Sequence, residues 1–138
     1  MTKSFSAQVD DWIKKVKGLE EAIFLKSVEK TIEIAQTPVA KGGRMRIDTS
    51  YLRNSGTTTL NAPVATVTFN LNKDAGLNRD DSIAVIAGAD ITDTIYFTWT
   101  ANYARIREQK DGFRLGAMQE WQTTVNQVVQ SAKSRFGR

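Results

Sequence analysis

The side chains that most often carry out hydrolysis are missing or isolated in this sequence. Its 138 residues include no histidine and no cysteine. Ser-His-Asp and Cys-His arrangements are therefore excluded, because both need an imidazole that accepts the proton of the nucleophile. Two adjacent acidic pairs remain, Asp10-Asp11 and Asp80-Asp81, but carboxylates that are neighbours in sequence rarely converge on one substrate. We interpret these pairs as a helix start and a turn, and we predict that the protein is not an enzyme.

Two other segments contain residue types found in ion-binding loops, but without the spacing that such loops require. The loop 72–81 contains aspartates and a glycine, yet it does not match the EF-hand pattern, and Lys73 and Arg79 would repel a divalent cation. Gly42-Gly43-Arg44 follows a predicted helix and is not followed by Lys-Ser or Lys-Thr, unlike a phosphate-binding loop. We therefore expect no bound metal and no cofactor.

The composition is that of one ordinary globular domain, which we place over residues 1–138. Hydrophobic residues make up 41 % of the chain and charged residues 25 %. The net charge is +4, and basic residues are concentrated in 38–53 and 105–138, on either side of an acidic middle. These basic segments lack the stacking aromatic residues or recognised motif that reading of bases requires. No run of about 18 apolar residues appears, so we expect no membrane association.

Apolar periodicity predicts a long helix at each end of the chain. The first begins near Phe5 after a Ser4 or Ser6 cap and ends before Pro38, with apolar residues every three to five positions. Gly18 lies in its middle and predicts a bend or break there. The last helix is predicted from Leu115 to Phe136 by apolar residues every three or four positions.

Between these helices, alternating apolar residues predict an antiparallel sheet of three or four strands, because the connections are too short for crossover helices. A short helix is predicted over Asn102–Gln109. The expected fold is therefore α+β, with the C-terminal helix packed on the sheet. The predicted strands are Thr57–Leu60, Ala65–Leu71, Ile83–Gly88 and Ile95–Thr100, and Trp12, Phe69, Trp99 and Trp121 are expected on the buried side.

Two short motifs resemble a family of neck and tail-completion proteins from long-tailed double-stranded DNA bacteriophages. Thr37-Pro38-Val39 followed by Asp48-Thr49-Ser50-Tyr51-Leu52-Arg53-Asn54-Ser55 is similar to the family signature P-V…D-T-G-x-L-R-x-S. Tyr103-Ala104-Arg105-Ile106-Arg107-Glu108 resembles its Y-A-x-x-x-E segment. Ser50 stands where the signature has glycine, and Gln109-Lys110-Asp111-Gly112 replaces the aromatic-Gly pair that follows the glutamate. The predicted order of elements agrees with the family over nearly the whole chain.

The resemblance implies a structural protein of the virion that joins the DNA-filled head to the tail, as a neck, tail-completion or tail-terminator protein. Its expected partners are copies of itself in a ring, with six copies as the expected number, and the neighbouring head-closure, connector and tail proteins. Non-specific contact with genomic DNA is compatible with this role. Assembly would take place in the cytoplasm of the bacterial host. The alternative is a small DNA-binding or packaging accessory protein.

From residue types alone, the segment Arg44–Ser55 is interpreted either as a structured loop or as an interaction surface. We expect it to be too polar for the core, with Leu52 docking it on the body and its arginines meeting a neighbouring subunit. We expect Tyr103 and Ile106 to anchor the short helix, and Glu108 to pair with a basic group. The candidate assembly-interface residues are Arg44, Arg46, Asp48, Tyr51, Arg53, Arg105, Arg107 and Glu108.

Overall fold

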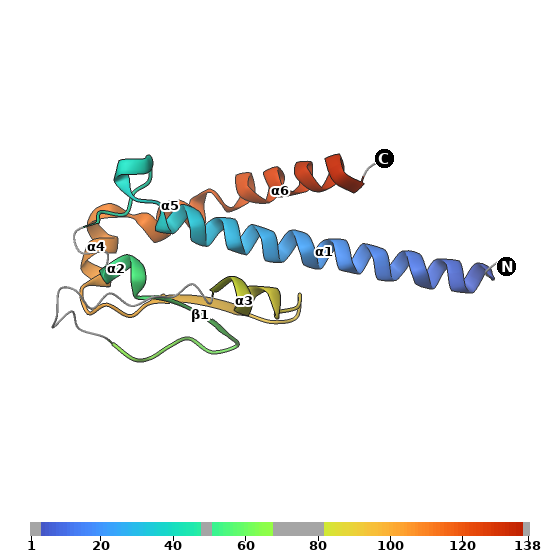
Figure 1. Cartoon of the computed structure of the whole chain (residues 1–138), viewed down its shortest axis with the longest axis horizontal. Coiled ribbons are helices and arrows are strands. Elements are labelled where there is room, and N and C mark those ends of the chain that lie inside the picture. The colour runs from blue at the N-terminus through green and yellow to red at the C-terminus, as the bar shows by residue number, and fades with distance from the viewer. Residues whose placement is uncertain (1–3, 48–50, 68–81, 137–138) are drawn as a thin grey trace.

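The computed structural model describes residues 4–47, 51–67 and 82–136, and it combines helices with a small sheet (Figure 1). In the ranges described, no helix has both the length and the apolar content that crossing a bilayer requires. The elements in chain order are α1 (Phe5–Gln36), the 3-10 turn η1 (Val39–Lys41), α2 (Tyr51–Asn54), β1 (Gly56–Leu60), α3 (Ser82–Ala87), β2 (Ile95–Trp99), α4 (Ala104–Asp111), α5 (Phe113–Gln119) and α6 (Trp121–Phe136).

The long first helix is confirmed at both ends. The Ser4 hydroxyl accepts a hydrogen bond from the backbone N–H of Ala7 at 3.2 Å, and Thr37 leaves the helix in an extended conformation ahead of Pro38. The break predicted at Gly18 is wrong, because α1 continues through it. A single glycine costs about 1 kcal/mol relative to alanine, which the hydrogen-bond ladder of a 32-residue helix outweighs.

Replacing Gly18 with alanine should raise the free energy of unfolding by about 0.5–1 kcal/mol, because a Cβ there meets nothing within 4 Å and removes backbone freedom from the unfolded chain. Gly112→Ala is the matched control. Its added Cβ also meets open space, but its φ of +64° disfavours an L side chain. The control should therefore lower stability in the same urea titration. Changes of the same sign in both variants would contradict this explanation.

The sheet is antiparallel, as predicted, but the described residues contain two strands rather than three or four. β1 and β2 pair from Gly56 opposite Trp99 to Leu60 opposite Ile95. The strand predicted over Ile83–Gly88 is wrong, because this segment forms α3. Its short continuous apolar run, Ile83-Ala84-Val85-Ile86-Ala87, fits a short strand or a short helix equally well. Of the predicted strand Ala65–Leu71, residues 65–67 are irregular and the remainder lies outside the described residues.

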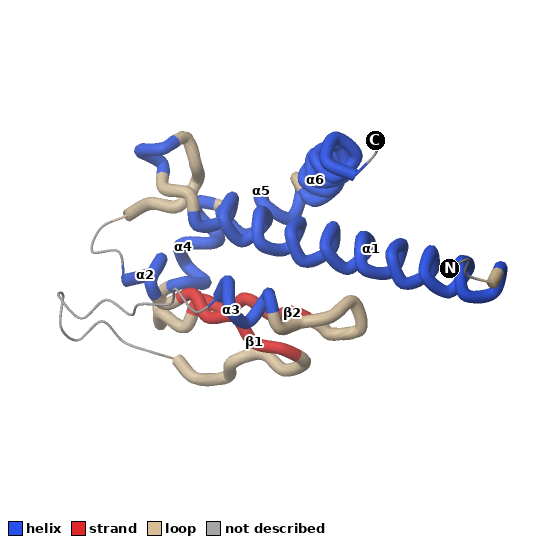
Figure 2. The backbone as a smooth tube through the Cα atoms, turned by 45° about the vertical axis from the view of Figure 1, so that its right-hand side comes forward, coloured by secondary structure: helices blue, strands red, loops and turns tan. Residues whose placement is uncertain are grey.

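α1 lies between the sheet and the C-terminal helices (Figures 1 and 2). α5 and α6 pack along α1, with Val128 and Thr124 buried. The prediction that the C-terminal helix packs on the sheet is therefore wrong. The predicted single helix is also divided in two, because the chain leaves helical geometry at Glu120.

The tryptophans are less buried than predicted. Trp12 is 64 % exposed and Trp121 is 37 % exposed, so the burial expected for both is wrong. Trp99 packs against the core, as expected, but it is only half-buried. Phe69 lies outside the described residues. Trp12 is exposed because the N-terminal part of α1 extends beyond α6 and the sheet (Figure 1).

The core cluster lies where the end of α1 meets β2, α4 and α5. The expectation that Arg44–Ser55 is too polar for the core is wrong, since this segment supplies three of the five residues in the cluster. Leu52 does dock the segment, as predicted. Met45 is buried because its backbone N–H bonds the carbonyl of Thr37, which draws the chain back over the end of α1. The cluster consists of Met45, Tyr51, Leu52, Ala101 and Phe113, with Trp99, Tyr103 and Ala104 packed against it.

Side chains also fix the turn before β2. Asp90 accepts hydrogen bonds from the Thr92 hydroxyl and, at 2.7 Å, from the Thr92 backbone N–H. Asp93 in turn accepts from the backbone N–H of Asp90 at 2.9 Å. The Thr92 hydroxyl and backbone N–H favour the charged carboxylate and hold the pKa of Asp90 below its usual value.

Candidate assembly site

Arg44 links the turn after α1 to the junction of α5 and α6. Its Nη1 lies 3.0 Å from a carboxylate oxygen of Glu120. The side chain also crosses Gly116, where an added Cβ would come within 2.5 Å of the arginine Nε. Gly116 therefore leaves the space that Arg44 occupies. The side chain remains 42 % exposed, so part of the guanidinium can still meet another molecule.

Arg53 closes the C-terminal end of α1. Its Nε donates to the backbone carbonyl of Gln36 at 3.1 Å, and the Gln36 side-chain amide donates back to the carbonyl of Arg53 at 2.9 Å. The Gln36 side-chain oxygen accepts from the indole N–H of Trp99 at 2.8 Å. Carbonyls at a helix end have no partner within the helix, and Arg53 supplies one. One glutamine thus joins α1, α2 and β2.

The other candidates of the first motif are divided between surface and core. Arg46 is exposed, and Asp48 lies outside the described residues. Tyr51 is 4 % exposed, and its ring centroid lies 6.5 Å from that of Tyr103. Tyr51 therefore packs inside the monomer rather than presenting its ring on the surface.

α4 carries the second motif. Of the two residues that we predicted to anchor it to the body, only one does so. Tyr103 packs against the core, as expected, but Ile106 is 56 % exposed, so its predicted anchoring role is wrong. Tyr103 precedes the helix, so helical spacing does not relate its direction to that of Ile106. Arg107 makes a two-oxygen ion pair with Asp111, with a closest distance of 2.7 Å. This i,i+4 pair stabilises α4 itself.

Glu108 holds the start of α5 through backbone groups. Its two carboxylate oxygens accept hydrogen bonds from the N–H of Arg114 at 2.8 Å and of Leu115 at 3.0 Å. The first N–H groups of a helix lack partners within it, and a negative charge there is favourable. Backbone N–H groups thus take the place of the basic side chain that we predicted for Glu108. The chain turns between the two helices at Gly112, whose left-handed conformation ends α4.

Glu108→Ala should lower the free energy of unfolding by about 1–2 kcal/mol, because two N–H groups of α5 lose their acceptor. Glu108→Gln should cost less, since an amide oxygen can still accept one of these bonds. Gln109→Ala, at the exposed neighbouring position, is the control and should change stability by at most about 0.5 kcal/mol. Urea titration of the three variants measures this order. Equal stability of the Glu108→Ala and control variants would refute the capping role.

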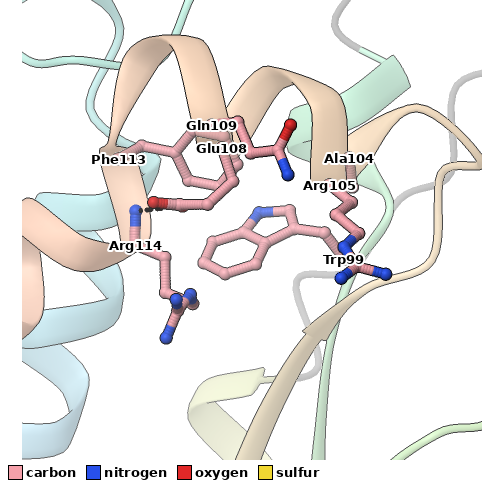
Figure 3. A pocket seen from close by; sticks show the side chains of 7 residues that line it. All are labelled: Trp99, Ala104, Arg105, Glu108, Gln109, Phe113 and Arg114. Atoms are coloured by element: carbon pink, nitrogen blue, oxygen red, sulfur yellow. Dashed lines mark hydrogen bonds between the residues drawn. The ribbon is translucent and has the colours of Figure 1, made fainter.

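A pocket of about 370 Å³ opens between the end of β2, α4 and the start of α5 (Figure 3). The Trp99 ring is fixed in it by edge-to-face contacts with Phe97 and Phe113, at centroid distances of 4.8 and 4.9 Å. Figure 3 shows the guanidinium groups of Arg105 and Arg114 on opposite sides of this ring. The lining residues are Trp99, Ala104, Arg105, Glu108, Gln109, Phe113 and Arg114.

The pocket has the chemistry of a binding site for an aromatic group that carries, or lies beside, an acid. Fixed rings offer edge-to-face contacts, and an arginine fork can bind a carboxylate through two hydrogen bonds. The second motif indicated Arg105 and Glu108 as interface candidates. Sequence reasoning missed Phe113 and Arg114 as their neighbours, because the glycine turn that folds α5 back on α4 determines this proximity.

No protein-family model matches the chain, and neither a curated protein nor a solved structure matches it. The likeness to phage neck and tail-completion proteins therefore rests on the two motifs of the sequence.

Proposed function

We propose that this chain is a structural protein of the head-to-tail connection in a long-tailed double-stranded DNA phage. Copies of it form a ring that joins the DNA-filled head to the tail, at the neck, tail-completion or tail-terminator position. The two motifs, in the family's order, support this assignment. The long first helix and the short helix that carries the second motif are both present at the positions predicted from the sequence.

The observation that carries the proposal is the apolar stripe on the exposed end of α1. Val9, Trp12 and Ile13 follow helical spacing and are each more than a third exposed, with Trp12 the most exposed at 64 %. Of the residues from Ser4 to Lys15 whose burial is assigned, all except Ala7 are exposed. An apolar stripe on one face of a projecting helix is typical of a surface that a partner covers. A subunit of an assembly accounts for it directly.

The arginines of the two motifs fall into two groups, those that bind groups of their own chain and those that are exposed. Arg44, Arg53 and Arg107 already bind groups of their own chain, at Glu120, Gln36 and Asp111. Arg46 and Arg105 are exposed. We therefore assign contacts between subunits first to Arg46 and Arg105, and only secondarily to the exposed part of Arg44.

Native mass spectrometry and negative-stain electron microscopy of the purified chain test the ring. We expect a closed ring of identical copies, with six as the expected number, that grows at the expense of monomer as concentration rises. Ile91→Glu is the control, because Ile91 is an exposed apolar residue on the turn between α3 and β2 and is not part of the stripe on α1, and this variant should assemble normally. A wild-type chain that stays monomeric across the concentration range would contradict the proposal.

A further inference from the structure

The apolar face of the projecting part of α1 contains a heptad seam. Its five residues are spaced by three and four positions in strict alternation: Val9, Trp12, Val16, Leu19 and Ile23. Apolar residues at positions a and d of a heptad are typical of helices that wind around each other as a coiled coil. Val9, Trp12 and Leu19 are exposed, so the described part of the monomer leaves this seam largely uncovered.

The residue types in the seam favour two parallel helices. Position a holds Val9, Val16 and Ile23, which are all β-branched, and position d holds Trp12 and Leu19. In parallel coiled coils, β-branched residues at a with leucine at d favour two strands. Each layer of such a pair brings together the same residue from both helices, so a second copy of this helix completes every layer.

The charges beside the seam also match those of a second copy. In a parallel pair, position g of one helix faces position e of the next heptad on the other helix, five residues further along. Lys15 occupies g and Glu20 occupies e, so two copies form this pair of opposite charges twice. An antiparallel pair that matched the same layers would instead bring Lys15 beside Lys15.

Lys15 and Glu20 are available for this contact. Both side chains are exposed, and neither forms an ion pair with another residue in the described ranges. They are five positions apart on one helix, whereas side chains that meet on the same helix are three or four apart. Their opposite charges can therefore meet between two copies but not within one.

The seam ends where α6 begins to lie beside α1. The next d position after Ile23 is Lys26, which is exposed and pairs with Glu29 at 3.4 Å. Leu19, Ile23 and Lys26 also line a groove whose other wall is α6. On the N-terminal side of this groove, α1 projects beyond α6 (Figure 1). A partner helix therefore fits along the projecting part.

We propose that the projecting parts of α1 from two copies pair in parallel as a two-stranded coiled coil from Val9 to Ile23. The partner that covers the seam is the same seam of a second copy. A two-fold axis relates the two copies, and this contact does not require the proposed ring. A ring of six copies would contain three such pairs, joined through other surfaces.

Disulfide crosslinking tests the pairing directly, because the chain has no cysteine of its own. Val16→Cys in the full chain should give a disulfide-linked dimer on mild oxidation, since a parallel pair places equal positions opposite each other within reach of a disulfide. Val9→Cys, at another a position, should behave in the same way. Lys14→Cys is the matched control, because this exposed position lies on the opposite side of the helix and should stay uncrosslinked. Circular dichroism checks that each variant remains folded.

Charge reversal tests the orientation in the Val16→Cys chain. Lys15→Glu or Glu20→Lys should each lower the yield of crosslinked dimer in dilute solution about tenfold, because two attractive pairs become two repulsive pairs. The two reversals in one chain should restore the yield, since the opposite charges then meet again with their positions exchanged. A merely structural effect of either substitution would not be restored.

Three results would overturn the pairing. These are equal crosslinking of Lys14→Cys and Val16→Cys, no crosslinking of either a-position variant, and crosslinking that the charge reversals leave unchanged. Rings from a wild-type chain whose a-position variants do not crosslink would refute the pairing and leave the ring intact. Crosslinked pairs from a chain that never forms rings would support the pairing and refute the ring.

Discussion

Phe113→Ala should lower the free energy of unfolding by about 3–5 kcal/mol, the largest loss that we expect from a single substitution in this chain. Phe113 is 1 % exposed, and its ring contacts Trp99 edge-to-face at 4.9 Å. Truncation removes this buried ring and leaves a cavity where β2, α4 and α5 meet. Urea unfolding followed by circular dichroism measures the loss.

Leu115→Ala is the matched control for Phe113→Ala. Leu115 lies two residues further along α5 and is 50 % exposed, so its truncation should cost at most about 0.5 kcal/mol. If both substitutions had the same small effect, the junction of β2, α4 and α5 could not be the core of the protein.

Met45→Ala should lower the free energy of unfolding by about 2–4 kcal/mol, because a fully buried side chain is replaced by a cavity. This result tests whether the basic segment after α1 belongs to the core. Arg46→Ala, at the exposed next position, is the control and should change stability by no more than about 0.5 kcal/mol. A loss that is equally small in both variants would mean that the segment is a surface loop after all.

Local signals predicted the elements that are long or clearly alternating. α1 was predicted from its stripe, its Ser4 cap and Pro38, β2 from its alternating apolar residues, and β1 as a short run that ends at Asn61 and Pro63. Local pattern failed for α3, because a short run of apolar residues fits two periods. It also failed to place α6, since periodicity shows which face of a helix is apolar but not which element covers that face.

The candidate site was predictable only in part, because its partners come from distant parts of the sequence. Arg44 binds Glu120, which is 76 residues away, and Trp99 binds Gln36, which is 63 residues away. Met45 was missed because charged neighbours on both sides conceal a core position. The exposure of Trp12 was also missed. An apolar stripe predicts that something covers it, but no element in the described part of the monomer covers this end of α1.

Deletion of the gene from the phage that encodes it tests the proposed function most directly, with electron microscopy of the particles made in the host. We predict heads filled with DNA and separate tails, and joined infectious virions when the wild-type chain is supplied in trans. Joined virions without the protein would contradict the account. Heads that remain empty of DNA would also contradict it, because they would assign the chain to packaging instead.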